Sequence, residues 1–357
     1  MGPVAIVGVG LMGGSLGLAL RGRDVRGVDP DPGALATALE MGAISQAAGS
    51  LEEAAAGADA VVLAAPVPSL SGLAVQALRA SGPSCVVTDL GSAKSEVMEA
   101  LGPEARERFI GGHPVCGAER SGVAFAREGL FRDATWFLTP GPEARPELFG
   151  RLHGLVVSVG ARPTAIDARV HDRLMALVSH LPHVLAGALI NQAAGTTFEG
   201  REALRSAGPS FSDLTRVAGS NPPLWADILL ANREAVLEAL RGYTGRLDDV
   251  GRALERGDRD WLLGFVGDAG SAKDRLRRID REGGVPARIV VAVPNRPGAI
   301  SEIATALGHA HINIEDLQLR PGPPEGEGEL ELALEGPEAA REAVRLVGER
   351  GYRAREV

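Results

Sequence analysis

A glycine-rich turn near the start of the chain constrains the fold more than any other feature. The aliphatic run 4–7 is followed by three glycines in the spacing G-x-G-x-x-G, namely Gly8, Gly10 and Gly13. An acidic residue, Asp29, ends the next apolar run, at the ~20-residue offset that this kind of turn shows. A strand, a glycine turn and a helix N-terminus together predict a pyrophosphate site, because the helix end presents unpaired N–H groups and a positive dipole.

Each residue of this turn has a physical role. Gly8 permits the tight turn, Gly10 lets the backbone approach the pyrophosphate, and Gly13 lets the helix pack closely on its strand. Asp29 would accept hydrogen bonds from the ribose hydroxyls and repel a 2′-phosphate, which favours NAD over NADP, although an upstream arginine could fold back. The alternative is a glycine-rich turn that binds nothing. The predicted cofactor site also contains Leu11, Met12, Ala65 and Pro66.

Short aliphatic runs alternate with Ala/Leu-rich helical stretches over the first half of the chain. Strands are expected at 4–7, 25–28, 60–64 and 85–88, and further strands at 109–111, 136–138 and 162–166. This alternation predicts an α/β domain with a parallel sheet covered on both faces. We therefore expect a Rossmann-type, doubly wound NAD-binding domain over residues 1–167.

The pattern changes after the first domain. An all-α domain is expected over residues 168–285, with helices through 174–194, 225–240 and 247–254 and no strand between them. Helical domains appended to a nucleotide-binding sheet commonly dimerise, so a homodimer is expected. Residues 286–357 predict a small α+β module in the order βαββα, with a further strand possible at 352–357. Its elements are expected at 288–293, 299–307, 312–319, 329–334 and 337–347.

Composition excludes several classes of partner. The chain has 357 residues, a formal net charge of −9 and no block of Lys and Arg, which argues against nucleic acid. Its two cysteines, Cys85 and Cys116, indicate a reducing compartment, and no Cys/His cluster predicts a metal site. No uninterrupted apolar stretch is expected to span a membrane. A cytoplasmic protein without a membrane partner is the prediction.

One histidine stands at the exit of a predicted sheet strand. His113 follows the strand at 109–111 and precedes Pro114, so its side chain should point toward the ligand crevice. Removing a hydride from a carbinol also requires acceptance of the hydroxyl proton, and histidine has a suitable pKa. A lone histidine is more often structural, but the strand order favours function here. Ser92, after another strand, is either a helix N-cap or a hydroxyl near the nicotinamide.

The helical domain contains a second group of chemistry-bearing residues. His180 and His183 lie on one helix face, and the intervening proline is expected to perturb that helix. Arg216 precedes Trp225, which is near a helix start. A half-buried arginine suits bidentate recognition of a carboxylate. The alternative for Arg216 is a surface ion pair with Asp213.

Five motifs in order give the chain a specific resemblance to a known family. They are Gly8-Val9-Gly10-Leu11-Met12-Gly13-Gly14-Ser15-Leu16, Asp89-Leu90-Gly91-Ser92-Ala93-Lys94, Gly112-His113-Pro114, Ser179-His180-Leu181-Pro182-His183 and Asp213-Leu214-Thr215-Arg216. Over nearly its whole length the chain resembles the prephenate/arogenate dehydrogenases of tyrosine biosynthesis. The resemblance implies that His113 contacts the ring hydroxyl of prephenate, and that Ser92 shares that hydroxyl beside the nicotinamide.

The same resemblance implies roles for the other candidate residues. Arg216 would hold a substrate carboxylate, and Glu119 and Asp213 would gate access and engage that arginine. The substrate pocket would be lined by His183, His180 and Trp225. Ala118 departs from the family, which often has threonine or serine there, so one hydroxyl contact is missing. His113 and Arg216 are therefore expected to face each other across one cavity.

The implied reaction is NAD-dependent oxidative decarboxylation of prephenate to 4-hydroxyphenylpyruvate. Arogenate, with an amine in place of a keto group, is the alternative substrate. A β-hydroxyacid dehydrogenase is a less favoured alternative. Those enzymes resemble this chain in the N-terminal motif but rely on a catalytic lysine in the helical domain, and the only lysine there, Lys273, is outside any matching motif. A non-catalytic regulator that responds to NAD and an amino acid is a further alternative.

The C-terminal segment resembles an ACT domain, a small amino-acid-sensing module. Asn295-Arg296-Pro297-Gly298 and His311-Ile312-Asn313-Ile314 carry this resemblance, although the turn usually begins with aspartate. The resemblance implies feedback control by L-tyrosine, with Asn295, Gly298 and Asn313 near the effector. The alternative is a dimerisation device without a ligand.

Overall fold

The computed structural model describes the chain except for residues 1, 118–120, 200, 283–286, 295, 297, 311, 321–326, 335 and 357, and except for the side chains of 277–282 and 315. The chain divides into two compact units. One comprises Met1–His171 together with Val285–Val357, and the other comprises Asp172–Gly284. Each unit is described by itself below.

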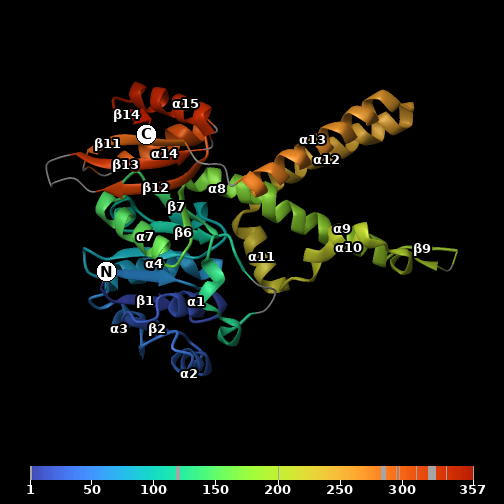
Figure 1. Cartoon of the computed structure of the whole chain (residues 1–357). Helices are drawn as coiled ribbons and strands as arrows, with labels where there is room; N and C mark the ends of the chain where they lie inside the picture. Colours follow the sequence, from blue (N-terminus) through green and yellow to red (C-terminus); the bar gives the residue numbers. More distant parts are fainter. Residues whose placement is uncertain are drawn as a thin grey trace. The chain divides into compact units, whose positions relative to one another are not determined.

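A five-stranded parallel sheet in the order β3-β2-β1-β4-β5 forms the N-terminal part of the first unit (Figure 1). Its elements are β1 (Val4–Val7), α1 (Leu11–Ala19), β2 (Val25–Val28), α2 (Pro32–Glu40), β3 (Gln46–Ala47), α3 (Leu51–Ala55), β4 (Ala60–Leu63), α4 (Val67–Ala80) and β5 (Val86–Asp89). The uniformly apolar strands β1 and β4 are completely buried, as expected for a sheet that is covered on both faces. The predicted Rossmann-type fold is confirmed. The two-residue strand β3 was not predicted, because so short a segment carries no periodicity.

A second sheet, β6-β7-β8, continues this layer. Its part of the chain contains α5 (Ser95–Glu99), α6 (Pro103–Arg106), β6 (Ile110–Pro114), β7 (Thr135–Pro140), α7 (Pro146–Ser158) and β8 (Arg162–Ala165). A parallel bridge between Val87 and Phe109 joins β6 to the edge strand β5. The carboxyl end of β6 therefore lies at the same edge of the sheet as the carboxyl ends of β1, β4 and β5.

The C-terminal module is an antiparallel sheet in the order β12-β13-β11-β14. Its elements are β11 (Ala287–Pro294), α14 (Ala299–His309), β12 (Ile314–Arg320), β13 (Glu327–Leu334), α15 (Gly336–Glu349) and β14 (Arg353–Glu356). Alternate residues of β11, namely Ile289, Val291 and Val293, are buried, and the helices α14 and α15 pack on this strand. The predicted βαββα order and the further strand are both present.

The C-terminal module packs directly on the nucleotide-binding part of the first unit. Strand β12 lies beside β8 and α7, and one apolar core cluster includes residues from both parts. The Ser301 hydroxyl on α14 donates to the Pro140 carbonyl oxygen at 3.5 Å. A side chain at Gly298 would collide with the Pro142 carbonyl, so the turn before α14 needs glycine both for this approach and for its φ of +86°.

The second unit is mainly helical, with α8 (Ala168–Met175) crossing the division between the units. It contains the π-helical turn Ala176–His180, α9 (Leu181–Ala194), α10 (Pro209–Thr215), α11 (Pro222–Ala231), α12 (Arg233–Arg256) and α13 (Arg259–Glu282). The π turn precedes Pro182, which lacks the N–H that would bond the Val178 carbonyl. The prediction that this proline perturbs the helix is therefore confirmed.

One expectation for this unit is wrong. A short hairpin, β9 (Thr197–Phe198) with β10 (Arg201–Glu202), lies where no strand was expected. The helical stretch expected at 247–254 is present as part of the longer helix α12. The long helix α13 was not predicted, because Gly264, Gly267 and Gly270 weaken its local helix propensity. Gly257, at φ +62°, ends α12 in the left-handed conformation, and Asp258 then accepts a hydrogen bond from the Trp261 N–H.

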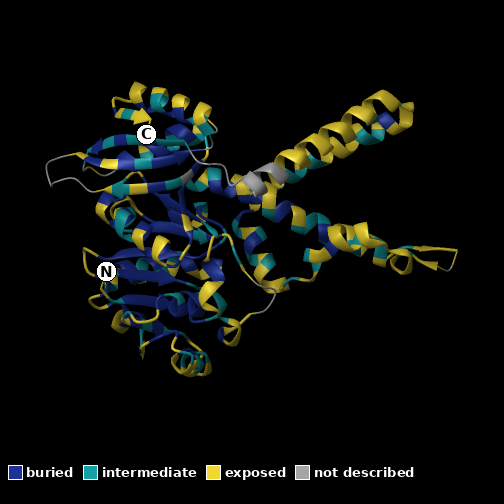
Figure 2. Cartoon of the chain, in the orientation of Figure 1, coloured by how far each residue is buried: buried dark blue, intermediate teal, exposed yellow. Residues whose placement is uncertain are grey.

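A continuous helix, Ala168–Ala194, is long and apolar enough to cross a membrane by length and composition alone, and 28% of its most apolar window is buried. One such helix is weak evidence for a membrane span, and its first turns contain Arg169, Asp172 and Arg173, so it is not an uninterrupted apolar stretch. Most of the exposed large apolar side chains belong to the second unit, including Leu177 (58% exposed), Leu214 (68%), Leu230 (69%) and Val266 (66%). Helices α12 and α13 are coloured as exposed along most of their length in Figure 2.

Candidate active site

The glycine turn leaves space where a pyrophosphate would lie. Gly8 has φ +93°, and a side chain there would collide with the Ala64 carbonyl, while one at Gly13 would collide with the Gly8 carbonyl. Apart from its own chain neighbours and helix backbone, no described residue has a heavy atom within 4 Å of the position that a Cβ would take at Gly10. Gly10 is also the N-cap of α1 and provides no side chain to occupy the free N–H groups. The turn therefore fits a dinucleotide, as its spacing predicts.

Asp29 lies directly against this turn. Its Oδ2 accepts a hydrogen bond from the Val9 N–H at 2.8 Å, and its Oδ1 accepts one from the Asp31 N–H at 2.9 Å. The carboxylate thus connects the glycine turn to the start of α2, where Asp31 accepts from the Gly33 N–H. Each carboxylate oxygen has a second lone pair. The predicted contact with ribose hydroxyls is compatible with this arrangement.

The predicted residues after β4 and β5 lie at the same edge of the sheet. Ala65 and Pro66 follow β4, and Pro66 is the N-cap of α4. Ser92 follows β5 and is half-buried, and its hydroxyl has no hydrogen-bond partner within the described part of the chain. The N-cap of α5 is Lys94, so the N-cap alternative for Ser92 is wrong. Its hydroxyl is therefore available to a ligand.

A buried ion pair holds the backbone beside His113. Lys94 and Asp89 are both 0% exposed and form a short ion pair. Lys94 Nζ also donates to the Gly112 carbonyl at 2.8 Å, and Asp89 Oδ1 accepts from the Gly112 N–H at 3.0 Å. The other carboxylate oxygen, Oδ2, accepts from the Gly91 N–H at 2.9 Å. No role was predicted for Lys94 from the sequence. The signal was its rarity, because the chain has only two lysines and this one is in a motif beside the cofactor site.

His113 is the fourth residue of β6 and is partly exposed. It pairs with Phe137 of β7, and its Nδ1 lies 2.9 Å from Nε2 of the buried His171. This places His113 at the ligand edge of the sheet, as the strand order predicts. Glu119, another predicted residue of this segment, is outside the described residues.

Three predicted substrate residues lie together in the second unit. The rings of His183 and Trp225 are stacked, with centroids 3.4 Å apart and planes at 14°, and His180 meets Trp225 edge to face. Burial lowers the pKa of His183, so its ring is neutral near pH 7. Within the described residues, His183 Nε2 is buried without a hydrogen-bond partner. A flat, neutral, largely apolar platform suits an unsaturated ring.

The tautomer of His180 follows from its neighbour Asn232. Asn232 Nδ2 donates to the Asp172 carbonyl at 2.7 Å and lies 3.1 Å from His180 Nδ1. Because the NH₂ end of the amide faces a carbonyl, His180 Nδ1 must accept the second hydrogen bond. The proton of the neutral ring is then on Nε2, which makes His180 a donor on its other side.

Arg216 and Asp213 are both exposed on α10 and the turn that follows it. Neither forms an ion pair with any residue that the structure describes, so the surface-pair alternative for Arg216 finds no support. Its guanidinium is available to a carboxylate. Since His113 and Arg216 belong to different units, the expectation that they face each other stays a prediction.

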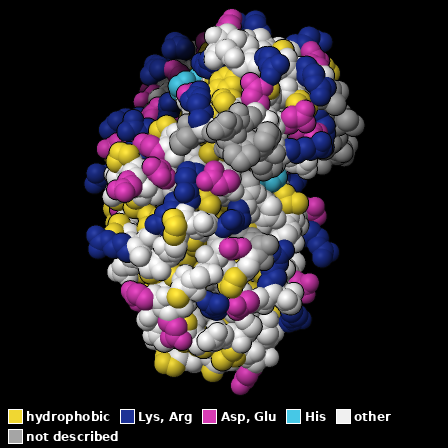
Figure 3. Space-filling view, turned by 90° about the vertical axis from the view of Figure 1, so that its left-hand side faces the viewer, with side chains coloured by type: hydrophobic (Ala, Val, Ile, Leu, Met, Phe, Trp, Pro, Cys, Tyr) yellow, Lys and Arg dark blue, Asp and Glu magenta, His cyan; other side chains and the backbone are white. Residues whose placement is uncertain are grey.

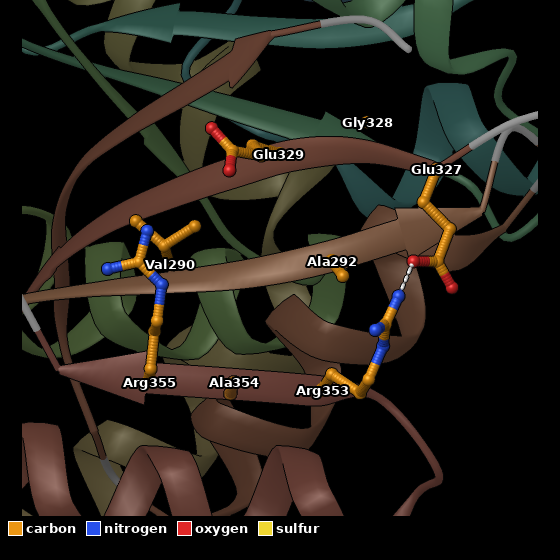
Figure 4. Close-up of a pocket in the computed structure, with 8 residues that line it drawn as sticks. All are labelled: Val290, Ala292, Glu327, Gly328, Glu329, Arg353, Ala354 and Arg355. Carbon is orange, nitrogen blue, oxygen red and sulfur yellow. Dashed lines mark hydrogen bonds and ion pairs between the residues drawn. The ribbon is translucent and has the colours of Figure 1, made fainter. Parts of the chain in front are cut away.

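The C-terminal module holds the remaining predicted residues. Gly298 is the N-cap of α14 and lies against Pro142, and Asn313 is exposed just before β12. Asn295 is outside the described residues. A shallow groove crosses the open face of the sheet, with Val290 and Ala292 as its floor between glutamates of β13 and arginines of β14 (Figure 4). None of its strands carries a predicted catalytic residue.

Basic and acidic side chains are interspersed on the face of the molecule drawn in Figure 3. This face has no broad area of one sign, which would be needed to follow a nucleic-acid backbone.

Comparison with known proteins identifies the family. Residues 16–165 match the prephenate dehydrogenase nucleotide-binding domain, residues 167–267 match the prephenate dehydrogenase dimerization domain, and residues 287–345 match the ACT domain. The chain belongs to the prephenate dehydrogenase family. The prediction of an NAD-dependent dehydrogenase with a helical dimerisation domain and an ACT domain is therefore confirmed.

Several relatives are similar over most of the chain. A prephenate dehydrogenase from Bacillus subtilis is 31% identical over 88% of this chain and 87% of its own length. A cyclohexadienyl dehydrogenase from Zymomonas mobilis is 31% identical over 77% of this chain and 96% of its own. A crystal structure of the Aquifex aeolicus prephenate dehydrogenase with hydroxyphenyl propionate and NAD⁺ has a TM-score of 0.72 at 29% identity, covering 77% of this chain and 98% of that one. The Synechocystis arogenate dehydrogenase has a TM-score of 0.68 at 28% identity, covering 77% and 99%.

Proposed function

We propose that this member of the family oxidises and decarboxylates prephenate with NAD, giving 4-hydroxyphenylpyruvate. The observation that carries the proposal is the position of His113 at the same edge of the sheet as the open glycine turn. A base and a dinucleotide site at one edge are what a carbinol oxidation requires. The relatives of this family support prephenate as the substrate class.

The residues of the first unit account for the proton. NAD, when bound, supplies the hydride acceptor. His113 accepts the hydroxyl proton of the ring carbinol, and Ser92, whose hydroxyl lacks a side-chain partner among the described residues, shares that oxygen. As the carbinol carbon is oxidised, the C–C bond to the ring carboxylate breaks, and CO₂ leaves while the ring becomes aromatic. Orientation, rather than a further reactive group, is the main contribution of the protein.

The residues of the second unit account for substrate binding in this proposal. Arg216, which forms no ion pair within the described part of the chain, forms a bidentate pair with a substrate carboxylate. The ring of the substrate lies against the platform of His183 and Trp225. His180 donates from Nε2, since Asn232 occupies its other nitrogen.

The quaternary and regulatory parts of the proposal rest on separate observations. The exposed leucines and valines of the second unit need a partner, and a second copy of the chain suits a unit that matches a dimerization domain. The ACT match supports L-tyrosine as an effector near Gly298 and Asn313. The free thiols of Cys85 and Cys116 support a reducing, cytoplasmic location.

The test is an assay of NADH formation with the purified chain. Prephenate and arogenate are each offered with NAD and NADP, and we expect the fastest turnover with prephenate and NAD. His113→Asn should abolish turnover while NAD binding is nearly unchanged, and Arg216→Ala should raise the substrate KM strongly. No reduced cofactor from either substrate would reject the proposal, and faster turnover of arogenate would reassign the substrate.

A further inference from the structure

His171 was not among the predicted site residues, yet it contacts the predicted base. It is 0% exposed, and its Nε2 lies 2.9 Å from Nδ1 of His113. The two rings meet edge to face, with centroids 5.1 Å apart and planes at 79°. The distance between the two ring nitrogens is that of a hydrogen bond.

Backbone hydrogen bonds at the start of α8 and a ring contact with Phe137 position His171. Asp167 caps the start of α8, where its Oδ1 accepts from the Arg169 N–H at 2.9 Å and its carbonyl accepts from the His171 N–H at 2.8 Å. The His171 ring also meets Phe137 edge to face, with centroids 5.3 Å apart. Since Phe137 pairs with His113 across β6 and β7, His171 packs against two neighbouring strand residues at once.

One proton must lie between the two ring nitrogens, and its location decides whether His113 can be a base. If His171 donates, His113 is protonated on Nε2 when neutral and has no lone pair for a substrate proton. If His113 donates through Nδ1–H, the lone pair of its neutral ring is on Nε2, the nitrogen that can accept a substrate proton. Only the second arrangement is compatible with the role of His113.

We propose that His171 is a positioning residue that accepts the Nδ1–H hydrogen bond of His113 and so keeps the His113 Nε2 lone pair directed at the substrate hydroxyl. This inference rests on the proposed function of His113. In the reaction the hydroxyl proton moves to Nε2, and the hydride moves to the cofactor. The resulting imidazolium still donates to a neutral His171, so no proton moves to His171.

A buried pair of charged groups bonds the backbone of this strand beside His113. Lys94 and Asp89 bond the Gly112 backbone and each other, and their charges are paired. Phe137, on the neighbouring strand, is apolar. Because these groups are the same in wild type and in a His171 variant, a change in the titration of His113 between the two proteins would report the substitution at His171.

The test compares His171→Leu with His171→Gln. Leucine removes the acceptor at similar volume, whereas the glutamine side-chain oxygen can reach the position of the imidazole Nε2. A positioned base contributes ~10²–10⁴-fold, so we expect kcat to fall about 10²-fold in H171L with little change in KM or NAD affinity. H171Q should retain kcat within about tenfold of wild type. The acidic limb of the H171L pH profile should move to lower pH, because the imidazolium has lost its acceptor.

A spectroscopic measurement tests the same inference without turnover. In protein labelled with ¹⁵N-histidine, the neutral His113 ring should show a protonated Nδ1 and an unprotonated Nε2, with H113N identifying its signals. A neutral His113 protonated on Nε2 would overturn the proposal, as would H171L turnover within twofold of wild type. If H171L does not fold, H171Q and the wild-type spectrum decide. If the wild type oxidises neither substrate, the proposed function fails, while the spectrum still decides whether the hydrogen bond exists.

Discussion

Replacing Lys94 by methionine should destabilise the first unit because it leaves a buried carboxylate without its cation. Lys94 and Asp89 are both fully buried, and Lys94 also donates to the Gly112 carbonyl. Removing one partner of a buried ion pair costs ~3–5 kcal/mol. Asp89 keeps two backbone N–H donors, from Gly91 and Gly112, so we expect the lower end, about 3 kcal/mol.

The assay is denaturant unfolding followed by the fluorescence of Trp136, which is 0% exposed on β7. Trp225 and Trp261 are replaced by phenylalanine in the reference protein, so that the signal comes from the first unit alone. A loss of about 3 kcal/mol multiplies the unfolding constant by ~10². The kcat of Lys94→Met should also fall, since the backbone beside His113 loses a hydrogen bond.

The matched control is Lys273→Met, since Lys273 is the other lysine and is exposed on α13. It should unfold like the reference protein. A double variant, Asp89→Asn with Lys94→Met, should be less destabilised than K94M, because no charge stays buried. If K94M unfolds within about 1 kcal/mol of K273M, the reasoning about this pair is refuted.

Three further predictions concern other parts of the first unit. Gly13→Ala should weaken NAD binding at least tenfold in a fluorescence titration, because its Cβ collides with the Gly8 carbonyl, and unchanged affinity would contradict that geometry. Burial lowers the pKa of His153 below the ordinary 6.5, so its contribution to stability is present above about pH 6.5 and is lost as the pH falls. The melting temperature of His153→Gln should therefore fall less between pH 7 and pH 5 than that of wild type, and equal slopes in the two proteins would reject this. The hydrogen bond from Arg296 lowers the pKa of Glu302, so Glu302→Gln should lower the free energy of unfolding by up to about 1 kcal/mol at pH 7. The variant should cost no stability once the pH has fallen through that lowered pKa, and a loss that persists in acid would argue against the ion pair.

Much of the fold could be predicted because its signals are local. Aliphatic runs bounded by turns located seven strands of the nucleotide-binding part, and the G-x-G-x-x-G spacing located the cofactor turn before any tertiary contact was considered. The expected elements of the C-terminal module also match the structure closely. Elements without a local signal were missed, namely the two-residue strand β3, the hairpin β9–β10 and the glycine-containing helix α13.

The candidate site likewise contains residues that the sequence locates and contacts that only the folded chain creates. His113, Ser92 and the glycine turn could be placed from strand order, because the carboxyl ends of parallel strands meet at one edge of the sheet. The pairing of His113 with His171, 58 residues away, and the enclosure of Lys94 with Asp89 are decided by tertiary packing. Periodicity and turn residues act over a few neighbours in the chain, whereas the proton location on a histidine and the cost of a buried charge depend on which distant groups the folded chain brings within hydrogen-bond distance.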